Sequence, residues 1–148
     1  MWGTAACGAA ALALVWSVAL TVSDLRERRL PDRLTVPAAA LVWILCPVTG
    51  HPWALAGALG WWALCVVPGK ITLRLRAGGG DAKLALSLGG IVAAVGGLPG
   101  WWLAVAASSV LTLCLVPLLR SSPGTLPHGP GMLGASWLAV IFPGFLTM

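Results

Sequence analysis

The chain has 148 residues, of which 59% are hydrophobic and only 9% are charged, and its formal net charge is +5. Soluble domains carry about 25% charged residues, so this composition excludes an ordinary soluble protein and indicates a single integral-membrane domain over residues 1–148. Nucleic-acid binding is excluded as well, because the Lys and Arg residues lie only in segments 26–33 and 70–83 and at Arg120, not along one basic surface.

Six apolar stretches cover most of the chain, at about 2–22, 35–50, 53–69, 82–98, 101–119 and 131–147. Each approaches the roughly 20 residues that a helix needs to cross the hydrocarbon of a bilayer. Helices are expected because lipid-exposed backbone must satisfy its own hydrogen bonds, and the stretches lack the alternation of barrel strands. The sequence therefore predicts an all-α polytopic membrane protein with six transmembrane helices in one bundle.

The first apolar stretch has the length of a secretory signal peptide. It has no basic residue before the apolar run, however, and a basic cluster at Arg26, Arg28 and Arg29 follows it. Signal peptides show the opposite order of charge. We expect a retained first helix with its N-terminus outside.

Clusters of Pro and Gly at 47–52 and 96–100 separate later stretches, as turn formers do. Five tryptophans follow these two turns, where amphipathic rings favour the membrane interface: Trp53, Trp61, Trp62, Trp101 and Trp102. For Trp16 and Trp43, packing inside the protein is the alternative.

With six spans, segments 23–34, 70–81 and 120–130 fall on one side of the membrane, and the two uncharged turns fall on the other. Every Lys and Arg then lies on a single face. By the positive-inside rule this face is cytoplasmic, so both termini are predicted outside the inner (plasma) membrane.

Four cysteines lie in apolar runs and show no CxxC spacing: Cys7, Cys46, Cys65 and Cys114. Zinc would need close pairs of ligands, so no metal site is expected. We interpret the cysteines as small apolar packing residues.

Two carboxylates lie at the ends of predicted spans and are the candidates for chemistry. Asp24 closes the first span, Asp81 opens the fourth, and the topology puts both at the cytoplasmic end. Carboxylates at a membrane border are costly, which favours a functional role. If the two side chains meet, they can share one proton and provide a general base for water and a general acid for a leaving amine, without a cofactor.

Both aspartates also have simpler structural explanations. Asp81 follows three glycines, and its role could be limited to capping the N-terminus of a helix. Asp24 could be a solvated charge beside the arginines of segment 26–29. Glu27 and Asp32 have weaker claims to a role in chemistry, because they lie inside the basic segment and are expected to pair with its arginines.

Both aspartates lie in segments with a recognisable pattern. Asp24 is followed six residues later by the apolar Leu30 and then by Pro31 and Asp32, and Asp81 lies in residues 78–83, GGGDAK. The first segment resembles the first aspartate motif of the type IV prepilin peptidase family, and the second is similar to the GxGD motif of that family and the lysine that usually follows.

A third segment matches a further motif of this family, and the three motifs occur in the same order along the chain. Residues 126–135, LPHGPGMLGA, are similar to the late Pro-Phe-Gly-Pro segment of the family. His128 stands where an aromatic residue is more usual, and Leu30 replaces a frequent Ile. Three ordered matches over almost the whole chain make the resemblance specific.

The resemblance implies a GxGD-type intramembrane aspartyl endopeptidase with Asp24 and Asp81 as its catalytic residues. Its substrates would be prepilins or pseudopilins, from which it removes a short basic leader at the cytoplasmic face, and its other partner is membrane lipid. The positions implied as substrate-binding or supporting are Gly78, Gly79, Gly80, Lys83, Pro31, Pro127, Gly129 and Pro130. Oligomeric state is not predicted. No N-terminal domain with CxxC pairs is present, so the chain looks like the short peptidase-only form of Tad/Flp-type pili, and methyl transfer is not expected.

Two other functions fit a polytopic chain. A small ion-coupled transporter or proton relay would need polar groups at mid-membrane, whereas all charged residues here lie at one face. A non-catalytic membrane scaffold would leave both aspartates dispensable. His128 could titrate near neutral pH, although we favour a loop residue that supports Pro127 and Pro130. His51, in an outer turn, has no evident chemistry.

Overall fold

The computed structural model describes residues 3–72, 78–119 and 127–142, and every regular element in these ranges is an α-helix. The helices are α1 (Thr4–Glu27), α2 (Asp32–Val48), α3 (Ala54–Ile71), α4 (Gly79–Leu119) and α5 (Gly129–Ile141). The all-α prediction is confirmed for these ranges. Parts of the predicted first and last spans (2 and 143–147) and of the predicted basic segments (73–77 and 120–126) lie outside them.

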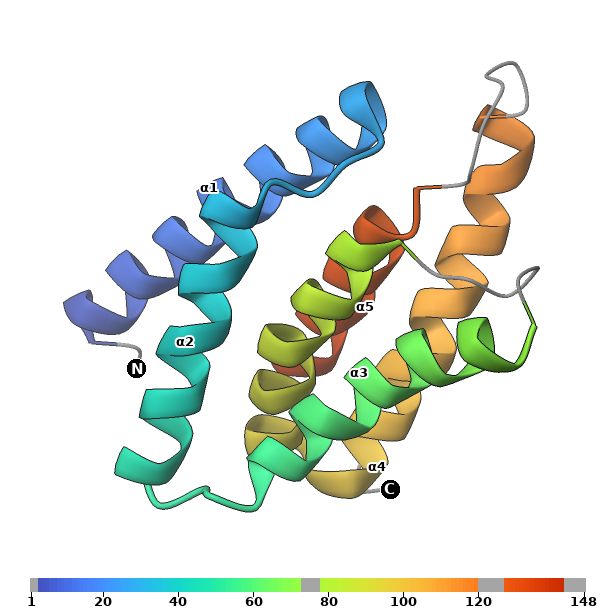
Figure 1. Ribbon diagram of the computed structural model, residues 1–148. Helices are drawn as coiled ribbons and strands as arrows, with labels where there is room; N and C mark the ends of the chain where they lie inside the picture. Colours follow the sequence, from blue (N-terminus) through green and yellow to red (C-terminus); the bar gives the residue numbers. More distant parts are fainter. Residues whose placement is uncertain (1–2, 73–77, 120–126, 143–148) are drawn as a thin grey trace.

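The fourth and fifth predicted spans form one element, α4, so the described chain has five helices and the prediction of six is not confirmed. A break is present within the predicted turn 96–100, because Gly97 has non-helical angles (φ 62°, ψ −162°). Figure 1 shows the chain reversing direction there, which divides α4 into a first arm (79–96) and a second arm (98–119). Pro99 then lies in the first turn of the second arm, where a missing N–H costs nothing.

Three helical segments in the described ranges are long and apolar enough to cross a membrane: Cys7–Glu27, Ala54–Ile71 and Gly79–Leu115. The last has 37 residues, which exceeds the length of one span. Large apolar side chains also point outward along the bundle, among them Leu12, Val48 and Ile71. Such a surface is suited to lipid, and the chain is therefore a membrane protein.

The polar ends of the helices gather at one end of the bundle. Figure 1 shows the end of α1, the starts of α2 and α5 and both outer ends of α4 in the upper half of the view, and the end of α3 at its right edge. The α2–α3 turn and the Gly97 reversal lie at the opposite, lower end. Arg26, Arg28, Arg29, Arg33 and Lys83 therefore belong to the end that also holds Asp24 and Asp81.

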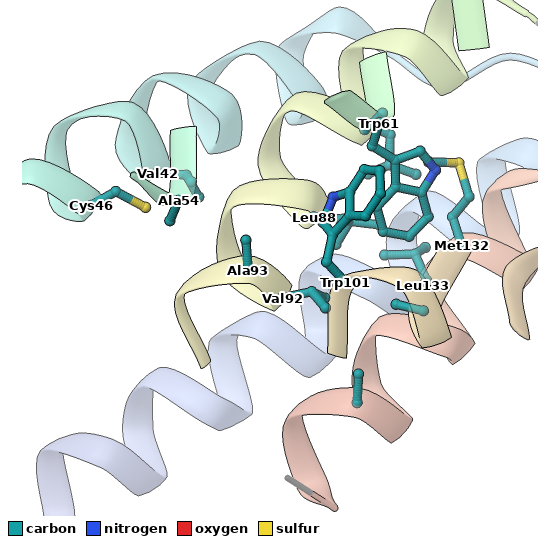
Figure 2. Close-up of a cluster of buried hydrophobic side chains, with 14 of the residues drawn as sticks. Val42, Cys46, Ala54, Trp61, Leu88, Val92, Ala93, Trp101, Met132 and Leu133 are labelled. Atoms are coloured by element: carbon teal, nitrogen blue, oxygen red, sulfur yellow. The ribbon is translucent and has the colours of Figure 1, made fainter. Parts of the chain in front are cut away.

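The core forms where α3 crosses the first arm of α4 at two glycines. A Cβ on Gly57 would lie 2.8 Å from the carbonyl oxygen of Gly89, and a Cβ on Gly89 would lie 2.6 Å from that of Gly57. Small residues at such crossings let two backbones approach closely in membrane proteins. Figure 2 shows the adjoining cluster around Trp61, Trp101 and Met132, to which α3, α4 and α5 contribute.

Two of the tryptophans predicted at the membrane interface lie in this core instead. Trp61 is 2% exposed, and Trp101 is buried with its Nε1–H donating to the carbonyl oxygen of Gly57 at 2.8 Å. An indole that finds such a partner can be buried without loss of a hydrogen bond. Trp53 and Trp102 remain exposed beside the turns, as the sequence predicted.

The cysteines confirm the packing interpretation only in part. Cys46 is buried in the core and Cys65 is half-buried, whereas Cys7 and Cys114 are exposed on the bundle surface. All four are free thiols.

Helix α1 contacts the remaining helices through one narrow face. Ser17, Leu20 and Asp24 are its buried residues, at a spacing that places them on one side of a helix. The Nε1–H of Trp137 in α5 donates to Ser17 Oγ at 3.0 Å, and the Nε1–H of Trp16 donates to the carbonyl oxygen of Leu34 in α2 at 2.9 Å. Trp16 therefore packs inside the protein.

Beyond these contacts α1 is separated from its neighbours. An apolar groove of about 610 Å³ lies between the N-terminal half of α1, the first arm of α4 and α5. The position of Asp24 consequently depends on a few specific contacts rather than on broad packing of α1.

We predict that Gly97→Ala lowers the thermal midpoint of unfolding in detergent, because its backbone angles are accessible essentially to glycine alone and cost other residues roughly 1–3 kcal/mol. Gly8→Ala is the matched control, since a Cβ there meets nothing within 4 Å and its φ is ordinary. Intrinsic tryptophan fluorescence would follow unfolding. Equal midpoints for the two variants would contradict the strained turn.

Candidate active site

Asp24 lies in the last turn of α1, where the chain makes a sharp corner into α2. Arg28 adopts left-handed angles (φ 51°, ψ 34°), and its N–H donates to the carbonyl oxygen of Asp24 at 3.0 Å, which ends the helix. Pro31 then precedes the first residue of α2 in extended conformation. Asp24 is only 5% exposed, so it is not the solvated juxtamembrane charge that the sequence left as an alternative.

The carboxylate of Asp24 is held by the start of α5. The N–H of Gly129, the first residue of that helix, donates to Asp24 Oδ2 at 3.0 Å. Free N–H groups and the positive end of the helix dipole make such a terminus a site for anionic groups. A Cβ on Gly129 would lie 2.7 Å from the same oxygen, so only glycine permits this approach.

Leu30 joins the three motif segments. A Cβ on Gly80 would lie 2.7 Å from Leu30 Cβ and 3.3 Å from its backbone nitrogen, so the start of α4 lies directly against Leu30. A Cβ on Gly129 would lie 3.4 Å from Leu30 Cδ2. The buried leucine is thus packed between the helix that begins near Asp81 and the helix that binds Asp24.

Asp81 is the third residue of α4 and is half-buried. Since α4 begins at Gly79, Asp81 is not the N-cap that the sequence left open. A hydrogen bond instead joins its carboxylate to the backbone of Gly78, and a Cβ on Gly78 would lie 3.2 Å from Asp81 Oδ2. Acidic residues in the first turn that reach back to a preceding N–H stabilise helix starts.

The two aspartates are brought to the same corner of the bundle. The charge of Asp24 acts on Asp81, although the residues come from different helices and are distant in sequence. Neighbouring carboxylates of this kind do not readily ionise together. The arrangement therefore favours one protonated and one ionised carboxyl group at this corner of the bundle.

Asp32 and Lys83 form an ion pair with Nζ and Oδ1 2.6 Å apart. Their side chains are 64% and 43% exposed, so the pair contributes little to stability. The sequence indicated that Asp32 would pair with the arginines of its own segment, whereas the structure gives it a partner in α4, Lys83. The pair joins the start of α2 to the start of α4 beside Asp81.

The remaining residues that the sequence singled out lie at the start of α5 and just before it. Pro127 is buried, and Pro130 lies in the first turn of the helix, where proline is favoured. The imidazole of His128 lies against α4, with its Nδ1 2.6 Å from Thr112 Oγ1. Thr112 was not found by sequence reasoning, since a threonine within an apolar helix carries no pattern.

Burial lowers the pKa of His128 below its ordinary value of 6.5, so the ring is neutral at physiological pH. Among the described residues, no group of three or more His, Cys, Asp or Glu side chains is arranged to hold a metal ion.

Comparison with known proteins identifies a family whose sequences match this chain. A family model described as the type IV leader peptidase family matches residues 11–117. Two curated relatives from Aeromonas salmonicida, one of them from strain A449, are named prepilin leader peptidase/N-methyltransferase and are each 32% identical to the chain over 166 aligned residues. The alignment covers 99% of this chain and 52% of each relative, so the chain spans about half the length of the curated relatives it matches. No solved structure shows a significant match.

We predict that Gly80→Ala destabilises the protein and Gly79→Ala does not. The added Cβ at position 80 would overlap Leu30, and overpacking of this kind costs about 1–3 kcal/mol. The added Cβ at position 79 meets nothing within 4 Å. Thermal midpoints of the purified variants would measure the difference, and a similar loss in both would show that the contact with Leu30 is not selective.

We also predict that acidification destabilises the protein through His128. Because the pKa is lower in the folded state, the unfolded chain binds more protons below pH 6.5, and stability falls as the pH drops through that value. Thermal midpoints at pH 7.5 and 5.5 would show the loss, which should be smaller in His128→Asn. An unchanged pH dependence in that variant would contradict the assignment.

Proposed function

The chain belongs to the type IV leader peptidase family, and from this membership and the geometry of the corner we propose that it is an aspartyl endopeptidase acting on prepilin-like proteins. The observation that carries the proposal is the meeting of three motif segments around Leu30, with Asp24 and Asp81 in the same corner. Asp24 and Asp81 are the catalytic residues. The substrate class is inferred from the relatives from Aeromonas salmonicida, which are named prepilin leader peptidase/N-methyltransferase.

In the proposed reaction, the two carboxyl groups share one proton. The ionised carboxylate removes a proton from water as the water oxygen attacks the carbonyl carbon of the scissile peptide bond. The protonated carboxyl group then donates its proton to the departing amine as the C–N bond breaks. Gly129 N–H already donates to Asp24 Oδ2, so the other oxygen of that carboxylate has more free acceptor capacity for water.

The proposed topology uses the same features. Helices α1, α2, α3 and α5 and the two arms of α4 supply six spans of a single domain over residues 1–148, with the kink at Gly97 as an outer turn. The Lys and Arg residues favour the cytoplasmic side for the end that holds the aspartates, which places both termini outside the inner membrane. The basic leader of the substrate would be cut at that face. We assign no methyl transfer to the chain.

The glycines and charged residues around the pair have supporting roles in this proposal. Gly80 and Gly129 let two helix starts reach Leu30, and Gly78 binds the carboxylate of Asp81 through its backbone. The exposed Lys83–Asp32 pair puts a cation and a further carboxylate beside the start of α4. A Cβ on Gly79 would meet no atom within 4 Å, so this position of the motif tolerates a side chain best.

The test is leader removal from a candidate prepilin co-expressed with the protein and followed by mass. Asp24→Asn and Asp81→Asn should each lower the rate by at least about a hundredfold, the scale of general acid–base catalysis, while the protein still accumulates in the membrane. Glu27→Gln, which changes an exposed acid of the same helix, is the matched control and should cleave at the parent rate. Cleavage at the parent rate by either Asn variant would refute the two-carboxylate mechanism and favour a scaffold.

A further inference from the structure

His128 is bound to the second arm of α4 by one side-chain hydrogen bond. Its Nδ1 lies 2.6 Å from Thr112 Oγ1, and the same hydroxyl lies 2.8 Å from the carbonyl oxygen of Ser108. A threonine hydroxyl has a single hydrogen, which it donates to the carbonyl oxygen. While it does so, the hydroxyl oxygen can accept a hydrogen bond from the imidazole in the tautomer that carries its proton on Nδ1.

A second contact holds α5 to the same turn of α4. A Cβ on Gly131 would lie 2.7 Å from the carbonyl oxygen of Ser108 and 3.2 Å from the nitrogen of Thr112. Backbone therefore lies against backbone at Gly131, with the threonine hydroxyl beside it. Residues 128 and 131 are both fixed to the turn at 108–112, one on each side of Gly129.

This anchoring bears on Asp24, because Gly129 donates its N–H to Asp24 Oδ2 at 3.0 Å. The direction of that N–H is set by the backbone of His128, which is held through its side chain. Asp24 itself belongs to α1, a helix with few contacts to the remaining bundle. The start of α5 is therefore the fixed point against which the carboxylate is oriented.

We propose that the Thr112–His128 hydrogen bond, here called the latch, is a positioning device that aims Gly129 N–H at Asp24 and thereby orients the carboxylate for catalysis. Thr112 and His128 are positioning residues, since neither touches the reacting atoms. The catalytic consequence rests on the proposed function, whereas the structural consequence at Gly129 does not. Small misplacements of a catalytic group slow the chemical step strongly.

The structural consequence can be measured without any substrate. His128 is followed by Gly129, whereas the other histidine, His51, is followed by proline, so labelling with ¹³C-carbonyl His and ¹⁵N-Gly gives a single His–Gly amide signal in NMR spectra of the whole protein in detergent. Thr112→Val removes the hydroxyl and keeps the shape of the side chain. It should move the Gly129 amide proton signal upfield, in the direction that Asp24→Asn moves it.

Thr112→Ser keeps the hydroxyl and should leave that signal at the parent position. His128→Asn puts an amide nitrogen near the place of Nδ1 and should also preserve it. The chain has no other Asn, so ¹³C-carbonyl Asn marks the bond in this variant. A parent-like signal in Thr112→Val would overturn the latch, whether or not the protein cleaves prepilin.

The catalytic consequence is a change in kcat alone. Thr112→Val should lower kcat by about 3- to 10-fold, the range of one lost hydrogen bond, with KM within about twofold of the parent. Thr112→Ser and His128→Asn should restore kcat to within about twofold. Ser109→Ala is the matched control on the same arm, because Ser109 is exposed and its hydroxyl bonds only within its own helix.

A second variant tests the same proposal if Thr112→Val does not fold. His128→Leu removes the latch from the other side and should show the same fall in kcat, and the double variant should be no slower than either single one. Additive losses, or an effect on KM alone, would contradict a shared positioning role. If the parent does not cleave prepilin at all, the proposed function fails, and the NMR measurement still decides the latch.

Discussion

The close approach of two helix starts to Leu30 is the contact on which the candidate site depends. Glycines at 80 and 129 remove the side chains that would keep α4 and α5 away from it. The stabilisation that one buried leucine provides is modest, about 1.5–3 kcal/mol. Its importance is geometric, since it brings the ends of three helices together from segments distant in sequence. Both aspartates belong to the elements that meet there.

A buried carboxylate needs compensation, and this fold supplies it locally. Asp24 receives a hydrogen bond from a helix terminus, and no buried side-chain nitrogen or oxygen atom in the described ranges lacks a hydrogen-bond partner. Burial of a charge is nevertheless costly for stability. An apolar residue at position 24 would avoid that cost, which is why a purely structural reason for Asp24 is weak. The indole contacts of Trp16 and Trp137 hold α1 in place where apolar packing is sparse.

Much of this arrangement could be predicted from the sequence because it depends on local signals. Apolar runs predicted the helical regions, the Pro and Gly cluster predicted the reversal that Gly97 makes, and the topology placed Asp24 and Asp81 at one end. The remaining features depend on packing between distant segments. Burial of Trp61 and Trp101, the Asp32–Lys83 pair and the Thr112–His128 bond each join different helices, and no spacing in the sequence marks such partners. The count of helices differed because the reversal at Gly97 occupies a single residue.

The open space around Gly79 has a practical value. It lies two residues before Asp81, on an exposed part of the first turn of α4, and a larger side chain there would meet no neighbouring atom. In a variant whose four native cysteines are replaced, a thiol introduced at this position could carry a spin label or a fluorophore without disturbing the packed glycine beside it. Under the proposed function, such a reporter would sense a peptide that arrives beside Asp81, and so would detect binding separately from cleavage.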